Sequence, residues 1–202
     1  MSAASLRALV VCANPNAQSF SHALAAAARE GLERGGHDVT TIDLYADGYR
    51  GAMSADERAA YHGERPVLDE AVARHIELVQ QSQILVFVYP TWWSGMPAIL
   101  KGWLERTMVP GVGFVFHPRT HRVKPGLTHV RHIVGISTYG SSRAYVATIN
   151  DNGRRALSRA LRMSTGWRTR CHWLGLYGID TSTADERAAF VERVKERTGR
   201  LT

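Results

Sequence analysis

The chain has 202 residues, of which 45% are hydrophobic and 21% are charged, and its formal net charge is +7. This length and composition predict one globular domain with a full hydrophobic core, and they exclude a collagen-like, mucin-like or wholly disordered chain. The sequence has no run of ~18 apolar residues, so we expect no insertion into a membrane.

The first residues and the cysteines bear on the compartment. The segment 1–5 is short and lacks a basic region, so we expect no secretory signal. Cys12 and Cys171 both lie in apolar runs, which fits reduced, packed thiols better than a disulfide. We therefore expect a cytoplasmic protein.

Positive charge is concentrated in the middle of the chain. Residues 106–179 hold 12 Lys and Arg against one Asp, whereas residues 1–105 hold 8 Lys and Arg against 12 Asp and Glu. Such a segment can attract a nucleic acid, an acidic lipid or a phosphorylated cofactor, or it can be a solvated surface. Because no RNA-recognition or zinc-finger motif accompanies the charge, we expect no nucleic-acid partner.

Apolar runs and helical periodicity alternate along the chain. Runs rich in β-branched and aromatic residues predict strands at 7–13, 37–44, 84–89, 132–137 and 171–179. Helical spacing predicts helices at 19–34, 67–80, 97–107, 152–164 and 183–197. Residues 45–66 form a long polar stretch, which is typical of a functional loop or of short helices.

This alternation predicts a parallel α/β sheet covered by helices. The run at 84–89 is apolar at every position, which places it in the middle of the sheet. Five such units fit a flavodoxin-like three-layer sandwich with a five-stranded parallel sheet of order 2-1-3-4-5, formed by a single domain over residues 1–202. In that topology ligands bind beyond the carboxyl ends of strands 1 and 3, so the loops of interest are 14–21, 90–96 and 137–145.

The first of these loops lacks the glycine patterns of the common nucleotide-binding loops. Its sequence, NPNAQSFS, matches neither the dinucleotide Rossmann fingerprint nor the P-loop. Gln18, Ser19 and Ser21 instead place hydrogen-bonding groups at the start of a helix, where free amides and the helix dipole suit a phosphate. Ser19 could equally serve only as the helix cap.

The second loop carries two adjacent tryptophans, in the sequence PTWWSGMP at residues 90–97. Adjacent side chains cannot both face one core, so a flat aromatic ligand that stacks on a ring explains Trp92 and Trp93 better than packing does. The third loop, STYGSSRAY at 137–145, offers hydroxyls and amides to a polar ring edge, and Tyr145 could donate a proton. By itself it is also compatible with an ordinary turn.

Residues 89–106, YPTWWSGMPAILKGWLER, resemble the NAD(P)H:quinone oxidoreductase family, the DT-diaphorase-like flavoproteins on a flavodoxin-like fold. Supporting matches are QSFS at 18–21, ISTYG at 136–140 and TADER at 183–187, in the order of the family, so the resemblance covers nearly the whole chain. It implies a homodimeric enzyme that takes a hydride from NAD(P)H and passes two electrons to a quinone or similar acceptor in a ping-pong reaction. The implied cofactor is FAD, with FMN as a close alternative.

The resemblance also assigns roles to residues. The first loop is implied to hold the flavin phosphates, the second the isoalloxazine with Trp93 against the ring, and the third the pyrimidine edge. Tyr145 is implied to relay a proton near the flavin carbonyl, and Phe114 and Phe116 to reach the partner subunit's site. The implied flavin-binding residues are Asn14, Gln18, Ser19, Phe20, Ser21, Pro90, Thr91, Trp92, Trp93, Ser94, Ser137, Thr138, Tyr139, Gly140, Tyr145 and, at the adenylate end of FAD, Arg187.

Three positions depart from the family pattern. Asn14 stands where the first loop often carries a histidine, and Asp151 stands in the place of the relay histidine, which puts that relay in question. Tyr139 stands where many relatives have glycine, so we expect a narrower pocket there.

Several alternatives stay open. An FMN-dependent azo, nitro or flavin reductase has the same fold, and a regulatory flavoprotein subunit of a potassium-efflux system is a rival from another class. Nine histidines raise the question of a metal, but the suggestive pairs His117 and His121, or His129 and His132, have no carboxylate nearby in sequence. We therefore expect no metal site.

Overall fold

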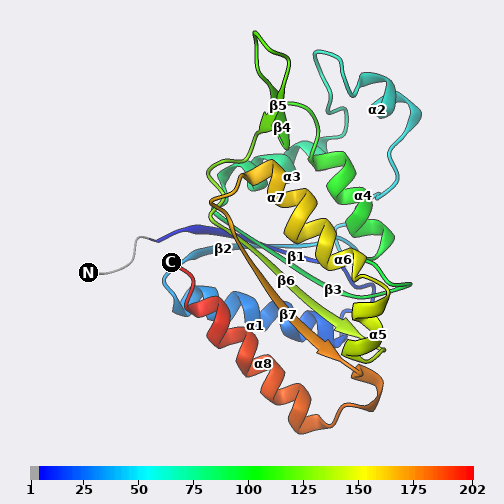
Figure 1. Cartoon of the computed structure of the whole chain (residues 1–202), viewed down its shortest axis with the longest axis vertical. Coiled ribbons are helices and arrows are strands. Elements are labelled where there is room, and N and C mark those ends of the chain that lie inside the picture. The colour runs from blue at the N-terminus through cyan, green and yellow to red at the C-terminus, as the bar shows by residue number, and fades with distance from the viewer. Residues whose placement is uncertain (1–4) are drawn as a thin grey trace.

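A five-stranded parallel sheet forms the centre of the molecule (Figure 1). The computed structural model describes residues 5–202, so the expectation for residues 1–4 lies outside the described residues. The strand order is β2-β1-β3-β6-β7, which confirms the flavodoxin-like class and the order 2-1-3-4-5 counted along the main sheet. These strands are β1 (Arg7–Cys12), β2 (Asp38–Asp43), β3 (Ile84–Pro90), β6 (His132–Tyr139) and β7 (Arg170–Tyr177).

The central strand is β3, as its composition predicts. Val86 pairs with Val10 of β1 on one side and with Val134 of β6 on the other, and all three side chains are buried. Because a strand in this position has a helix layer on each face, it is apolar at successive positions rather than at alternate ones.

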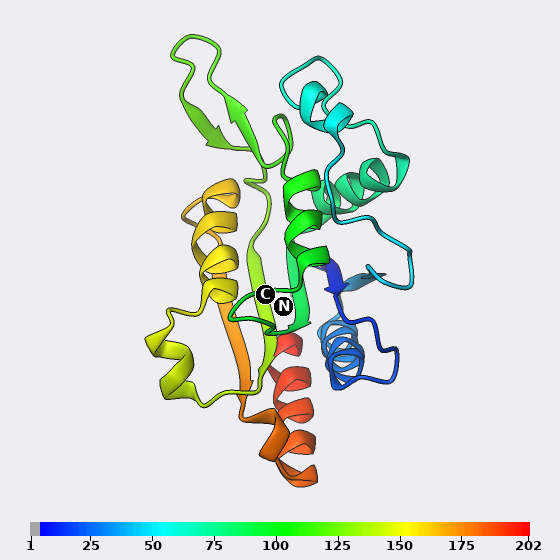
Figure 2. The ribbon, with the colours of Figure 1, turned by 90° about the vertical axis from the view of Figure 1, so that its right-hand side faces the viewer.

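Helices cover both faces of the sheet (Figures 1 and 2). On one face, α1 (Phe20–Arg34) and α8 (Ala184–Gly199) pack over a core that includes Val10 and Val134. The opposite face has a second core around Phe87 and Trp103. None of the helices within residues 5–202 is long and apolar enough to cross a membrane. The helices of the second face are α3 (Glu70–Gln81), α4 (Ala98–Thr107), α6 (Asn152–Arg155), the π-helical turn η1 (Ala156–Leu161) and α7 (Arg162–Thr165).

The structure departs from the predicted elements in two ways. The predicted helix 152–164 is interrupted by η1, and the predicted strand 171–179 ends at Tyr177 because Gly178 takes a left-handed conformation with φ 66°. Elements of three to six residues are too short to show a periodicity, which is why the sequence did not predict them. They are α2 (Ala55–Ala60), β4 (Phe114–Phe116), β5 (Val123–Pro125), α5 (Arg143–Thr148) and the 3-10 turn η2 (Ile179–Thr181).

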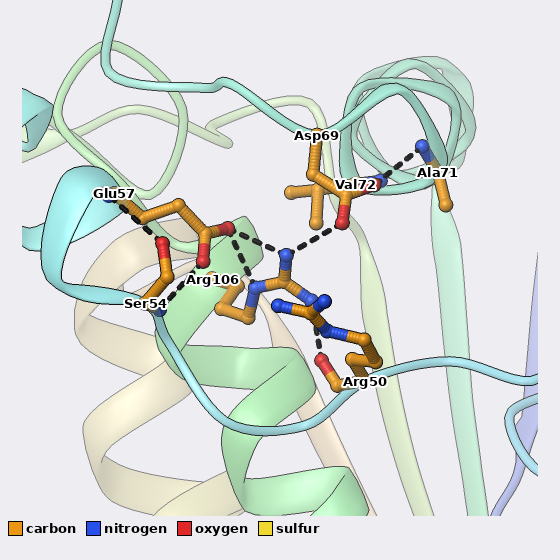
Figure 3. A network of polar contacts seen from close by, with 7 residues as sticks. All are labelled: Arg50, Ser54, Glu57, Asp69, Ala71, Val72 and Arg106. Carbon is orange, nitrogen blue, oxygen red and sulfur yellow. Dashed lines mark hydrogen bonds and ion pairs between the residues drawn. The ribbon is translucent and has the colours of Figure 1, made fainter.

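A buried guanidinium ties the long polar segment 45–66 to α4 (Figure 3). Arg106 donates to Glu57 at 2.5 Å and 2.8 Å and to Asp69 at 2.8 Å, and it also donates to the carbonyl of Arg50. The hydrogen bond from Arg106 lowers the pKa of Asp69. Burial alone would raise the pKa of Glu57, but hydrogen bonds from Ser54 and Arg106 bring it below its usual value. Both carboxylates therefore stay charged opposite the guanidinium.

Replacing this guanidinium should destabilise the fold strongly. We expect Arg106→Ala to reduce the free energy of unfolding by about 3–5 kcal/mol, because it leaves the Glu57 carboxylate buried without its partner. Urea unfolding followed by circular dichroism measures the loss. Arg29→Ala is the matched control, since Arg29 pairs with Glu33 at the surface, and it should cost no more than about 0.5 kcal/mol. Equal losses in the two variants would contradict this account.

A pair of histidines, His132 buried and His172 half-buried, lies near the amino ends of β6 and β7. Nδ1 of His132 lies 3.1 Å from Nε2 of His172, and Nε2 of His132 lies 2.9 Å from the carbonyl oxygen of Thr202. Since that carbonyl can only accept, Nε2 of His132 carries the proton and a neutral His132 accepts from His172. Burial lowers the pKa of both histidines, and neighbouring positive groups add to this effect, while the hydrogen bond to Thr202 offsets part of it for His132.

Stability should therefore fall on mild acidification. In the unfolded chain these histidines bind protons near their ordinary pKa of about 6.5, whereas in the folded chain their pKa values are lower. Because the unfolded state binds more protons between pH 7 and pH 5, the free energy of unfolding should fall over that range. We expect His172→Gln to make this fall shallower in urea titrations at the two pH values. The exposed His62→Gln should keep the wild-type slope, and a wild-type slope in His172→Gln would show that the pair contributes nothing.

Candidate functional site

The carboxyl ends of β1, β3 and β6 meet at one edge of the sheet. Cys12 pairs with Val88, and Pro90 pairs with Thr138, so the three strands end at nearly the same level. The amide of Ala13 still donates to the carbonyl of Val88 at 3.0 Å, one residue beyond β1. The three loops singled out from the sequence therefore lie next to one another.

The middle loop turns sharply at its two tryptophans. The amide of Trp92 donates to the carbonyl of Gly95, and the amide of Gly95 donates to the carbonyl of Trp92, both at 3.0 Å. The two residues between them, Trp93 and Ser94, have φ of 46° and 62°. Left-handed conformations at both central positions belong to a type I′ turn, which normally uses Asn and Gly because other side chains are strained there.

This turn presents aromatic surface to solvent. Trp93 is fully exposed and Trp92 is 45% exposed. A purely structural role as a core plug is therefore excluded for Trp93. A large exposed aromatic ring in a strained backbone conformation is a reason to expect a function.

The start of the middle loop is fastened to β6. The amide of Thr91 donates to the carbonyl of Thr138 at 2.8 Å, and the hydroxyls of Thr91 and Ser137 lie 2.9 Å apart. Ser137 and Thr138 are buried and Thr91 is half-buried, so these hydrogen bonds hold this part of the edge in place. The second and third loops thus share one set of polar contacts.

The first loop is built from short-range turns. The side chain of Asn14 accepts from the amide of Asn16 at 3.0 Å and donates to the hydroxyl of Ser21 at 3.2 Å. Ser19 caps α1 by accepting from the amide of His22. A helix start has several free amides, and this cap engages only one of them, so the cap and a phosphate site are compatible.

The sequence reasoning missed a polar chain behind this loop. The hydroxyl of Ser19 lies 2.9 Å from Nδ1 of His22, and Nε2 of His22 lies 2.7 Å from Oδ2 of Asp43 at the end of β2. Burial would raise the pKa of Asp43, but the hydrogen bonds from His22 and from two backbone amides hold it below its usual value. The sequence did offer one sign of this contact: Asp43 lies at the end of the strand that neighbours β1, at the same edge of the sheet.

In the third loop, Tyr139 and Asp151 are partners. The hydroxyl of Tyr139 donates to Oδ2 of Asp151 at 3.0 Å, and its ring stacks on Tyr177 with centroids 4.5 Å apart. Burial, together with the charge of Asp151, raises the pKa of Tyr139 far above its usual range, so the hydroxyl remains a donor. Asp151 in turn caps α6 by accepting from the amide of Arg154.

Tyr145 makes no hydrogen bond to Asp151 within residues 5–202. Tyr145 belongs to α5, its side chain is 55% exposed, and its hydroxyl makes no hydrogen bond within residues 5–202. The hydroxyl partner of Asp151 is Tyr139 instead. Gly140, which follows β6, approaches the carboxylate of Asp180, and a Cβ added there would lie 2.8 Å from that group.

Arg187 lies in the first turn of α8. A Cβ added to Gly31 would meet the carbonyl of Lys195, and one added to Gly35 would meet the carbonyl of Gly199, so α1 and α8 approach closely near their carboxyl ends. Towards its amino end α8 runs away from α1 (Figure 2). The guanidinium of Arg187 donates to the carbonyl and the hydroxyl of Ser182 at 2.5 Å and 3.3 Å.

The predicted partner-site aromatics stand away from this edge. Phe114 and Phe116 face each other in a T-shaped arrangement on the hairpin β4–β5, with centroids 5.7 Å apart. Figures 1 and 2 show the hairpin projecting at the opposite end of the molecule from α5. These rings therefore do not line the edge of their own chain.

The thiol nearest the site is not a nucleophile. Cys12 is free and buried, as expected, and burial raises the pKa of its thiol to about 12. A protonated, enclosed thiol is unreactive. The edge thus offers aromatic rings, hydroxyls and helix-start amides, which suit the binding of a flat, phosphorylated ligand.

Comparisons with known proteins agree with this geometry. A family model described as flavodoxin-like fold matches residues 7–197. The chain is 30% identical to NAD(P)H dehydrogenase (quinone) 1 of Cavia porcellus over 158 residues, 71% of this chain and 57% of that protein. It is 31% identical to ribosyldihydronicotinamide dehydrogenase (quinone) of Pongo abelii over 123 residues, 54% of this chain and 53% of that protein. The chain thus spans little more than half the length of these curated relatives.

Solved structures share the fold over nearly the whole chain. An NAD(P)H:quinone oxidoreductase from Methanothermobacter marburgensis has a TM-score of 0.78 at 24% identity, covering 98% of this chain and all of that one. An FMN-dependent NADH-azoreductase from Bacillus anthracis, solved with FMN, has a TM-score of 0.72 at 15% identity, covering 97% and 99%.

The strain in the tryptophan turn can be measured. We expect Trp93→Asn to raise the free energy of unfolding by about 1 kcal/mol, because Asn tolerates the left-handed conformation that strains Trp. Urea unfolding of the purified protein without added ligand measures the gain. Leu68→Ala, at another exposed apolar position, should leave stability nearly unchanged. A loss of stability in Trp93→Asn would mean that the indole packs against the protein.

Proposed function

The chain belongs to the flavodoxin-like fold family, and from that premise we propose that it is a flavin-dependent oxidoreductase that uses NAD(P)H to reduce a quinone or a similar acceptor. The observation that carries the proposal is the strained Trp92–Gly95 turn, which holds two exposed indoles at the carboxyl edge of the sheet. The relatives named as quinone-dependent dehydrogenases support the choice of acceptor.

The residues at this edge fit a flavin. The free amides at the start of α1, together with Gln18, Ser19, Phe20 and Ser21, would hold its phosphates. Trp93 would lie against the isoalloxazine, and the hydroxyls of the third loop would meet the polar edge of the ring. The remaining proposed ring contacts are Asn14, Pro90, Thr91, Trp92, Ser94, Ser137, Thr138, Tyr139 and Gly140.

The flavin, when bound, would accept a hydride from NAD(P)H and pass two electrons to the acceptor. The protein would orient both substrates at the same place, one after the other, which is the basis of a ping-pong reaction. The open stacking surface beside Trp93 suits a nicotinamide and a quinone alike, since both are flat rings. The hydrogen bonds between Thr91 and β6 would keep that surface in position during turnover.

Tyr145 and Asp151 are the proposed catalytic residues. The exposed hydroxyl of Tyr145, without a hydrogen-bond partner within residues 5–202, is available to donate to an oxygen of a bound ring. Such a donor would stabilise negative charge that develops there. Asp151 would act at the same edge of the sheet, with its carboxylate oriented by Tyr139.

FAD is the proposed form of the flavin. Arg187, in the first turn of α8, would contact the adenylate half of FAD, as its match to the TADER motif of the family implies. FMN lacks that half, so it would not use Arg187.

A homodimer would complete the site. The hairpin β4–β5 exposes Val115, Phe116 and Val123, and an exposed apolar hairpin suits a protein partner. Because the hairpin β4–β5, which carries Phe114 and Phe116, projects away from the carboxyl edge of its own sheet (Figure 1), these rings would reach the site of the second subunit. We also place the protein in the cytoplasm, which suits two free cysteines and a nicotinamide co-substrate.

The spectrum and the turnover test this proposal directly. The purified protein should show flavin absorbance, release FAD on denaturation and oxidise NADH or NADPH only when a quinone is present. Turnover with an azo dye but not with a quinone would favour the azoreductase alternative. Flavin without turnover would favour a regulatory flavoprotein, and failure to take up added flavin would overturn the proposal.

The role of Arg187 can be separated from that of the ring site. We expect Arg187→Ala to weaken FAD binding about tenfold, since charge-assisted hydrogen bonds to phosphate are worth about 1.5–3 kcal/mol, and to leave FMN binding unchanged. Fluorescence titration of the flavin-free protein measures both affinities. Arg29→Ala, at an exposed position of α1, should change neither. Equal weakening of FAD and FMN would remove the assignment of Arg187 to the adenylate half.

A further inference from the structure

An arginine-rich groove runs along the helical segment 152–165, beyond the flavin edge. Its volume is about 940 Å³. Other residues of the same segment, such as Ala156 and Leu161, also line a separate apolar cavity with α4, so the segment has a basic side and an apolar side. The groove is lined by Ala147, Asn150, Asp151, Arg154, Arg155, Ser158, Arg159, Ala160, Arg162, Met163 and Trp167.

The π-helical turn η1 helps to gather the arginines. In an α-helix, residues five apart such as Arg154 and Arg159 point about 140° away from each other. The wider π turn, with its i→i+5 hydrogen bonds over Ala156–Leu161, brings such residues closer to one side. Four arginines line this groove, and the guanidinium of one of them, Arg154, also lies 5.9 Å from the ring centroid of Trp173.

The charge of this groove is not balanced by the protein. None of its four arginines forms an ion pair within residues 5–202. The one carboxylate in the groove, Asp151, is engaged with Tyr139 and with the amide of Arg154. Arg154 and Arg155 also occupy the start of the helical segment, where the helix dipole disfavours cations. An anion in the groove would relieve both kinds of repulsion.

An exposed tryptophan stands at the far end of the groove. Trp167 is 76% exposed, and the guanidinium of Arg162 lies 5.5 Å from its ring centroid. Arg162 also donates to the carbonyl of Trp167 at 2.8 Å, while its Nε is buried without a partner among the described residues. An indole held in this way offers a stacking surface for an aromatic base.

The groove begins where the proposed flavin site ends. Asp151 lines the groove and is hydrogen-bonded to Tyr139, the last residue of β6. Arg159 lies eight residues further along the helical segment, roughly 12 Å away at 1.5 Å per residue. A dinucleotide with one ring at the flavin could extend its other half over this distance.

We infer that the arginine groove binds the 2′-phosphate and the adenine of NADPH, which makes the protein select NADPH over NADH. The two co-substrates differ only in one phosphate monoester, a dianion that guanidinium groups bind through paired hydrogen bonds. Arg155 and Arg159, in the middle of the groove, would hold the phosphate, and Trp167 would stack on the adenine. This inference rests on the nicotinamide co-substrate of the proposed function.

Calorimetric titration with NADP⁺ and NAD⁺ tests the groove without turnover. We expect the purified flavoprotein to bind NADP⁺ at least about tenfold more tightly than NAD⁺, because charge-assisted hydrogen bonds to the extra phosphate are at stake. Arg159→Ala and Trp167→Ala should each weaken NADP⁺ binding, and only Arg159→Ala should abolish the preference. Arg65→Ala, an exposed arginine outside the groove, should preserve it.

Steady-state kinetics separate this inference from the proposed function. Arg159→Ala should raise the KM for NADPH about tenfold while the KM for NADH and both kcat values stay unchanged. Equal binding of NADP⁺ and NAD⁺ by the wild type, with quinone turnover intact, would overturn the assignment of the groove to NADPH and leave the proposed function unaffected. A groove that binds single-stranded RNA and does not yield it to NADP⁺ would also overturn the inference. If the protein shows no turnover but has an NADP⁺ preference that depends on Arg159, the inference about the groove is supported and the proposed enzymatic function is refuted.

Discussion

The parallel pairing of β3 with β1 and β6 is the constraint on which the rest of the structure depends. It brings three chain segments, far apart in sequence, to the same edge, and it does so whatever the loops contain. Because β3 is buried on both faces, the strands on either side must be covered by helices that begin at this edge. The helix starts, with their free amides, therefore gather where the loops do.

The loops at this edge are held in costly conformations that the surrounding structure supports. Trp93 and Ser94 occupy left-handed backbone regions between strand and helix. Within α4, Gly102 packs so closely on Gly51 that a Cβ added to Gly102 would lie 1.8 Å from the carbonyl oxygen of Gly51. That close approach gives a physical reason for the glycine in the sequence LKGW. The fold thus fixes α4 firmly while the turn before it remains exposed.

The arginines of this chain serve opposite purposes. Arg106 is buried, has two carboxylate partners and a carbonyl, and joins α4 to the segment before α3 (Figure 3). Arg155 and Arg159 have no carboxylate partner within residues 5–202 and face a groove. A satisfied buried charge contributes to a unique structure, whereas an unsatisfied charge at the surface favours an anionic ligand. The excess of 11 positive charges in residues 106–179 therefore includes two kinds of arginine, one buried and paired and the others unpaired in a groove.

By itself the sequence determined the five strands, their order and the loops that meet at the edge, because apolar runs and helical periods are local properties. It also singled out the pair Trp92 and Trp93, since two adjacent tryptophans cannot both face one core. Only the tertiary structure decided the partners: His22 with Asp43, and Tyr139 rather than Tyr145 with Asp151. It likewise decided that residues 152–164 contain a π turn and that Phe114 stands on a hairpin. These contacts depend on how distant segments pack, which no local pattern of side chains records.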